Sequence, residues 1–214
     1  SGAMDLRSYR LANALVLNQH DEPSIEFAYQ GPLLKLKNGK INFAITGEVM
    51  FNIIRTNSTV EEGKCYQNYV LEKNEQLDIL STKKSVYGYL AISGGIKSEK
   101  IWNSCSINTK ANIGPNNGNK YSINEKIFIN NSDNDLIPEK KVDITFSPNN
   151  LIRVIKGTNF DYFSKASQEK FFKENYLITN LTDRMGMRLK GSALEKTKST
   201  NIKSEGLIRG VIQV

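Results

Sequence analysis

Residues 86–95 of the chain read Val86-Tyr87-Gly88-Tyr89-Leu90-Ala91-Ile92-Ser93-Gly94-Gly95. The first eight are mostly aromatic and branched apolar side chains, a composition typical of a β-strand. The two glycines that follow are typical of a turn, because glycine adopts backbone conformations that other residues avoid. The stretch therefore predicts a strand over residues 86–93 that ends at Gly94-Gly95.

Shorter segments on both sides of this stretch carry the same signal. Residues 24–29 alternate in polarity, with Ile25, Phe27 and Tyr29 on one side, and Gly31-Pro32 then turns the chain. Further strands are predicted at residues 41–46, 69–71, 123–129, 151–155, 177–179 and 207–214. Many short strands separated by turn residues predict a mainly β, barrel-like fold.

Helices are predicted at only two places. Asp5 is suited to cap a helix over about residues 6–17, in which Tyr9, Ala12 and Val16 share one face. Asp161 is expected to cap a second helix that runs to about Lys173, with three side chains inward: Phe163, Ala166 and Phe171. Each half of the chain thus combines one helix with several strands.

A polar segment divides the chain. Residues 131–150 are rich in Asn, Asp, Ser, Pro and Lys, a composition typical of a linker or of a long excursion between subdomains. We therefore expect an N-terminal β-barrel-like subdomain over residues 1–130, this connecting segment, and a second β subdomain over residues 151–214.

Composition favours a globular chain with an ordinary surface. Apolar residues make up 39% and charged residues 24%, which is enough to form a packed core. The net charge of +7 raises the question of nucleic-acid binding, but the basic residues are spread along the chain and form no stripe with aromatic residues. No apolar run is long enough to span a membrane. We expect neither nucleic acid nor membrane as a partner.

The cysteine and histidine content gives little support to thiol or metal chemistry. Cys65 and Cys105 are not part of a CxxC motif, and His20 is the only histidine. A reduced, cytoplasmic chain is the simpler interpretation, and the alternative is a single disulfide between the two cysteines. One histidine and two distant cysteines do not favour a zinc site, so no metal is predicted.

Motifs spread over the whole chain occur in the order found in one known family. They are Ser1-Gly2-Ala3-Met4-Asp5, Ala12–Val16 with Asn18, Ile25-Glu26, Gly31-Pro32, Tyr89–Ile96, Ser104-Cys105-Ser106, Gly114, Arg153–Ile155 with Gly157, Asp183–Gly191, Ser204–Gly206 and Gly210–Val214. The sequence in this way resembles the allophanate hydrolase subunit 2 family, which includes the C subunit of 5-oxoprolinase and the carboxyltransferase part of urea carboxylase. The resemblance implies a cyclophilin-like β-barrel fold and a chain truncated at both ends.

The same resemblance implies an activity and partners. Members act in the ATP-dependent opening of 5-oxoproline to glutamate, together with an allophanate hydrolase subunit 1-like companion and a third, LamB/YcsF-like subunit. ATP would then act at the level of the complex, and the substrate would be a small molecule. Urea carboxylase relatives instead transfer a carboxyl group from carboxybiotin to urea, and biotin enters only in that alternative. A third possibility is a non-catalytic regulator of a kinase inhibitor protein.

The sequence departs from the family pattern at a few positions. Leu17 replaces a usual glycine, and Asn103 replaces the glycine before Ser104. Further departures are Ile107, Pro115, Asn119 and Thr158-Asn159. Most of these lie in residues 103–119, so ligand contacts are least certain in that region, whereas the segment around Arg184 is intact.

The strongest candidates for chemistry are Arg184 and Arg188. A guanidinium group offers a planar fork of donors that fits carboxylate and phosphoryl oxygens, and Gly186 between the arginines would let both reach one cavity. Glu205 is the candidate general base. The alternative is structural: the arginines would bond backbone carbonyls at a barrel rim, and Glu205 would be a surface turn residue.

Further residues are candidates for substrate binding. Gly94 and Gly95 resemble an anion-cradling turn, Ser104 and Ser106 offer hydroxyl groups, and Gln213 offers an amide that suits a lactam or urea. Asp5 is equally explained as a helix cap. The remaining candidates are Asn13, Met185, Gly186 and Ser204.

Overall fold

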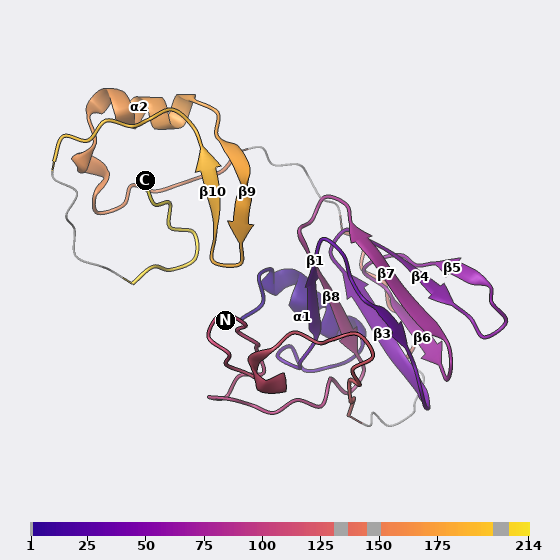
Figure 1. The fold of residues 1–214 in the computed structure, drawn as a ribbon. Helices are drawn as coiled ribbons and strands as arrows, with labels where there is room; N and C mark the ends of the chain where they lie inside the picture. Colours follow the sequence, from indigo (N-terminus) through magenta and orange to yellow (C-terminus); the bar gives the residue numbers. More distant parts are fainter. Residues whose placement is uncertain (1, 131–136, 145–150, 199–205) are drawn as a thin grey trace. The chain divides into compact units, whose positions relative to one another are not determined.

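The computed structural model describes residues 2–130, 137–144, 151–198 and 206–214 (Figure 1). The chain divides into two compact units, Ser1–Phe146 and Ser147–Val214. The described residues are mainly β, with antiparallel strands, as the sequence predicts.

Unit 1 contains two four-stranded antiparallel sheets. The first has the order β1-β8-β3-β6, formed by Ile25–Ala28, Tyr87–Ile92, Lys40–Thr46 and Asn68–Glu72. The second has the order β2-β7-β4-β5, formed by Leu33–Lys35, Gln76–Thr82, Val49–Ile54 and Val60–Glu62. The predicted strand at residues 86–93 is β8, and it lies between β1 and β3.

The main core joins the inner faces of these sheets. Because side chains alternate along a strand, β3 directs Ile41, Phe43 and Ile45 to one face, where they pack with Phe51 and Ile53 of β4. Phe43, Ile45 and Ile53 have no exposed surface at all. The remaining buried members are Phe27, Val49, Leu71, Leu77, Ile79, Leu90 and Ile92.

The opposite face of β3 and β8 is covered by α1, Leu6–Leu15. Here Ala12, Leu15 and Val16 of the helical segment pack against three strand residues, Ala44, Tyr89 and Ala91. Asp5 caps the helix, as predicted, and its carboxylate accepts hydrogen bonds from the amides of Arg7 and Ser8. The helix, the first sheet and the second sheet thus form three layers.

Residues 137–142 of the predicted connecting segment belong to unit 1 and pair with residues next to β6. Lys141 forms a β-bridge with Gln67, and the amide of Val142 donates to the carbonyl of Tyr66 at 2.8 Å. Asn68 accepts from the amide of Lys140 at 2.7 Å and donates to the carbonyl of Pro138 at 3.1 Å. This part of the segment therefore extends the β6 edge of the first sheet.

Several strands of unit 1 differ from the sequence prediction. The strands predicted at 24–29, 41–46 and 69–71 are found, but β2, β4, β5 and β7 were not predicted. The strand predicted at 123–129 is wrong: Ile123 is 93% exposed, and only Ile129 forms a single bridge, to Ile96. Tyr29 has a positive φ of 62° and is exposed, so the alternation that includes Phe27 stops before it. Residues 112–120 form a loop with one 3-10 turn, η1, at Asn116–Gly118.

Unit 2 contains η2 (Phe160–Tyr162), α2 (Lys165–Lys173) and a hairpin of β9 (Leu177–Asp183) and β10 (Gly186–Lys190). The predicted cap of α2 is wrong: Ser164 accepts from the amide of Ser167, whereas Asp161 lies in η2, and Ala166 is exposed rather than inward. The strands predicted at 151–155 and 207–214 are also wrong, since the structure forms no strand at these residues.

Gly88 lets β1 and β4 approach β8. A Cβ at this position would lie 2.5 Å from the ring of Phe27 and 2.7 Å from Cγ2 of Val49. We expect Gly88→Ala to lower the free energy of unfolding by about 1–3 kcal/mol through overpacking. Gly157→Ala is the control, because no atom lies within 4 Å of its Cβ position, and we expect a change within about 0.5 kcal/mol. Equal effects in urea denaturation would contradict this explanation.

The partly buried thiol of Cys65 makes the free energy of unfolding decline at alkaline pH. Burial raises the pKa of its thiol from 9.0 to about 11, and the thiol donates to the carbonyl of Val49 at 3.2 Å. The folded chain therefore holds this proton more tightly than the unfolded chain. The stability that the protonated thiol contributes is complete below pH 9 and is lost as pH rises toward 11. We expect Cys65→Ser to flatten the decline in unfolding free energy over this interval, measured by denaturation at several pH values. An unchanged slope would contradict the assignment.

Candidate functional site

The β9–β10 hairpin carries the predicted arginines at its tip and on one strand. Asp183 pairs with Gly186, so Arg184 and Met185 form a two-residue turn. The Asp183 carboxylate accepts from the amide of Met185 at 2.7 Å and from that of Gly186 at 3.3 Å, which fixes the turn. The register shifts between Met187 and Leu189, and such bulges change the direction of a strand's side chains.

Arg184 and Arg188 are both exposed, as are Met185 and Gly186 between them. The backbone of Arg188 is held by the Thr179 hydroxyl, which donates to its carbonyl at 2.9 Å. An exposed cationic hairpin can bind an anion, but enclosing a small molecule requires a second surface opposite the arginines.

Three other predicted residues belong to the C-terminal part of the chain. Ser204 and Glu205 lie outside the described residues. Gln213 is exposed in a segment, residues 206–214, that contains no strand. The proposed base and the lactam-binding amide therefore remain predictions.

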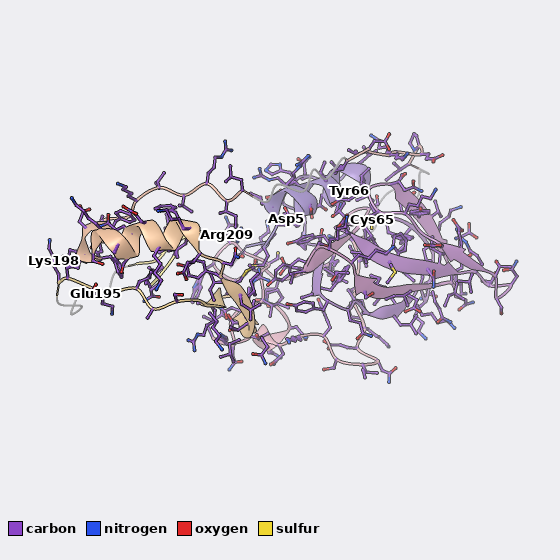
Figure 2. All side chains as sticks on the ribbon, turned by 90° about the horizontal axis from the view of Figure 1, so that it is seen from above. Asp5, Cys65, Tyr66, Glu195, Lys198 and Arg209 are labelled. Atoms are coloured by element: carbon purple, nitrogen blue, oxygen red, sulfur yellow. The ribbon has the colours of Figure 1, made fainter. Side chains whose placement is uncertain are left out.

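The Asp5 side chain is engaged at the start of α1 (Figure 2). Its Oδ1 accepts from the amides of Arg7 and Ser8 at 3.0 and 3.1 Å, and its Oδ2 accepts from the Ser8 hydroxyl at 2.6 Å. These contacts are those of a helix cap, the structural alternative that the sequence left open.

A buried tyrosine, not identified from the sequence, holds the segment before the helix. The Tyr89 hydroxyl accepts from the amide of Asp5 at 2.7 Å and donates to Oε2 of Glu26 at 2.8 Å. The same Glu26 oxygen accepts from the amide of Met4 at 2.8 Å. Burial raises the pKa of Tyr89, so its hydroxyl keeps its proton at neutral pH. The signal available in the sequence was Glu26, a carboxylate between two apolar strand residues.

Asn13 is fully buried and connects α1 to the end of β8. Its Oδ1 accepts from Nδ2 of Asn18 at 2.9 Å, and its own Nδ2 donates to the carbonyl of Glu22 at 3.0 Å. Asn18 in turn donates to the carbonyl of Ile92 at 2.8 Å and accepts from the amide of Gly94 at 2.8 Å. Asn13 thus positions other groups and is not accessible to a ligand.

Gly94 and Gly95 form the predicted turn, with φ values of 80° and 77°. These contacts favour a structural turn over an anion cradle, because both amides have partners within the chain. The Gly94 amide donates to Asn18, and the Gly95 amide donates to the carbonyl of Ile92 at 2.9 Å. A Cβ on Gly95 would lie 2.7 Å from a carboxylate oxygen of Glu22, so the nearest charge is also negative.

Ser104 and Ser106 lie on an irregular part of unit 1. Ile101 and Ser104 form a β-bridge around a two-residue turn, and the amide of Ser106 donates to the Ser104 hydroxyl at 3.2 Å. Ser104 is exposed and Ser106 is half-buried. The hydroxyl of Ser104 is therefore accessible but serves a local contact.

The part of the chain that the structure describes contains neither a cluster of metal-ligating side chains nor a disulfide bond. No group of three or more His, Cys, Asp and Glu side chains there is arranged to hold a metal ion. Cys65 and Cys105 are both free thiols. Across the same residues, no helix combines the length and apolar character that crossing a bilayer demands.

Two departures from the family pattern coincide with unusual backbone. Leu17 has a φ of 58° and Asn103 a φ of 61°, conformations that glycine adopts at little cost. At the end of α1, the amide of Leu17 donates to the carbonyl of Ala14 at 3.2 Å and that of Asn18 to Asn13 at 2.9 Å. This pair of bonds is the Schellman motif, whose left-handed residue is usually glycine.

Leu17 is therefore strained and is also 59% exposed. We expect Leu17→Gly to raise the free energy of unfolding by about 0.5–1 kcal/mol, because relief of left-handed strain exceeds the entropy that glycine adds to the unfolded chain. Ala14→Gly, at an exposed position inside α1, should instead lower it by about 1 kcal/mol. Thermal denaturation of both variants tests this, and destabilisation by Leu17→Gly would contradict it.

The chain is similar in sequence to two kinds of known protein. The chain is 26% identical to the C subunit of the 5-oxoprolinase of Escherichia coli (strain K12), over 100% of this chain and 67% of that protein. It is 28% identical to urea amidolyase of Lachancea kluyveri, over 89% of this chain and 11% of that protein. The chain is thus homologous to this 5-oxoprolinase component and to one part of urea amidolyase.

A solved structure has the same fold. The crystal structure of the K. lactis urea amidolyase matches 92% of this chain and 12% of its own length, with a TM-score of 0.74 and 22% identity. The sequence model of the family described as "Carboxyltransferase domain, subdomain A and B" matches residues 1–214. The chain therefore belongs to this carboxyltransferase domain family.

Proposed function

We propose that this chain is part of a 5-oxoprolinase subunit that opens 5-oxoproline to glutamate together with companion subunits. The observation that carries the proposal is similarity to the C subunit of 5-oxoprolinase over the whole chain and 67% of that protein. The urea amidolyase match covers only 11% of a much longer protein. The match to the 5-oxoprolinase subunit spans all of this chain, and it is the basis of the proposal.

The β9–β10 hairpin would supply the anion contacts of this reaction. The substrate carries a carboxylate, and coupling to ATP would convert the lactam carbonyl oxygen into a phosphorylated leaving group. The exposed Arg184 and Arg188 are suited to both groups, because guanidinium donors pair with carboxylate and phosphoryl oxygens. Glu205 is the proposed general base.

The companion subunits would complete this site. Both arginines are exposed on the hairpin, and in this proposal a companion subunit supplies the surface that encloses the substrate. The proposed partners are an allophanate hydrolase subunit 1-like protein and a LamB/YcsF-like protein. ATP would be bound at the level of this complex, since the chain has no GxxxxGK[ST] phosphate-binding motif.

A second candidate is the carboxyltransferase component of a biotin-dependent urea carboxylase. The family description and the urea amidolyase matches favour it. In that reaction the same arginines would hold the carboxylate that moves from carboxybiotin to a urea nitrogen. The two functions differ in whether turnover requires biotin.

The proposed arginine role is tested in the full-length protein co-expressed with its companion subunits. We expect 5-oxoproline-dependent ATP hydrolysis in the wild type, and a loss of about 100-fold or more in kcat/KM for Arg184→Ala or Arg188→Ala, since each removes charged donors to the transition state. Arg7→Ala is the control, because Arg7 is an exposed arginine on α1 of unit 1, and we expect it to keep wild-type turnover.

The outcomes separate the candidates. Wild-type turnover in both hairpin variants would contradict the arginine role. Biotin-dependent carboxylation of urea without 5-oxoproline turnover would favour the carboxyltransferase alternative.

A further inference from the structure

The single tryptophan of the chain, Trp102, is 82% exposed. It lies in the two-residue turn that joins the bridged residues Ile101 and Ser104. Tryptophan is rarely left this open to water, because its large apolar ring gains from burial. An exposed tryptophan at the tip of a turn is typical of a contact with another molecule.

The backbone at this tip is strained. Trp102 has a φ of 48°, and Asn103 follows with a φ of 61°. Asparagine tolerates this region, but a bulky aromatic residue does so at a cost. The core does not require the strain, since Trp102 is not among its members. Strain at an exposed aromatic residue points to a role outside folding.

The shape of the site indicates what kind of molecule binds. Small ligands bind in concave sites that bury most of their surface, whereas an 82% exposed ring protrudes. A protruding tryptophan needs a pocket on the other molecule, and proteins supply such pockets at their interfaces. The partner is therefore a protein.

The surroundings indicate the chemistry of that pocket. Residues 97–130, the irregular loop that follows β8 and Gly94-Gly95 (Figure 1), contain five lysines and two glutamates, a net charge of five minus two, or +3. Lys97 and Lys100, close to Trp102 in sequence, are exposed. The same loop exposes Phe128 by 65% and Ile123 by 93%. An apolar pocket with an acidic rim complements this loop.

We propose that Trp102 anchors unit 1 to a companion protein subunit, by inserting its indole into an apolar pocket rimmed by acidic side chains. That the partner is a companion subunit of the same enzyme rests on the proposed function. Trp102 has no part in the reaction itself.

The test is binding of the full-length protein to its co-purified companion subunits, measured for wild type and variants. We expect Trp102→Ala to raise the dissociation constant by about 30-fold or more, as for a central aromatic anchor. The matched control is Tyr29→Ala, since Tyr29 is also an exposed aromatic residue at positive φ in unit 1, with 62% exposure and a φ of 62°. We expect the control to bind as the wild type does.

A second variant separates binding from folding. Trp102→Gly removes the ring and relieves the backbone strain, so its melting temperature should equal or exceed that of the wild type while binding is lost.

Lys100→Glu should weaken binding further at low salt than at high salt if the pocket rim is acidic. A 5-fluorotryptophan label in this chain alone gives a direct reading, as the Trp102 fluorine signal should shift when the companion is added.

Each outcome has a defined meaning. Unchanged affinity in Trp102→Ala, an unmoved fluorine signal, or no complex with the wild type would overturn the inference. A complex that depends on Trp102 but does not hydrolyse ATP with 5-oxoproline would leave this inference standing and contradict the proposed function instead.

Discussion

The architecture of unit 1 depends on two strands, β3 and β8, that are buried on both faces. On one face Phe43, Ile45 and Leu90 fill the space between the sheets, and on the other Ala44 and Ala91 contact α1. The small side chains are essential here, because a helix packs closely on a sheet only where the strand residues beneath it leave room. Tyr89 is a large, fully buried residue on this face, with the half-buried Tyr87 beside it, and its hydroxyl reaches the amide of Asp5 at the start of the helix.

Burial on both faces favours pairing among the polar groups at this interface, although Oδ1 of Asn42 on β3 is buried with no hydrogen-bond partner. An unpaired buried amide or hydroxyl would lose its hydrogen bonds to water without replacement. Asn13 and Asn18 meet this requirement at the end of α1, and Tyr89 and Glu26 meet it at the start. Residues that resemble ligand-binding groups in the sequence are thereby explained as the contacts that fix one arrangement of helix and sheet.

The strands of unit 2, in contrast, are largely exposed. Its hairpin has one hydrogen-bonded partner for each strand, and large apolar residues such as Met185, Leu181 and Leu177 are 64–78% exposed. A two-stranded hairpin gains little stability by itself in water. The proposed catalytic arginines lie on this element, and the proposed anchor Trp102 lies on an irregular loop. The groups offered for function are therefore on exposed elements, whereas the doubly buried strands are occupied with structure.

The sequence by itself determined the mainly β class, the family, the strand at residues 86–93 and the helix capped by Asp5, because apolar alternation and capping are local signals. It did not reveal β4 or β7, and it predicted strands at 123–129, 151–155 and 207–214, where the structure describes no strand. A strand exists only where another chain segment accepts its hydrogen bonds, and that pairing is a long-range property. The tertiary structure alone decided that Asn18 accepts from the Gly94 amide, that Asn13 is buried and that Trp102 protrudes, since burial and exposure depend on how segments distant in sequence pack.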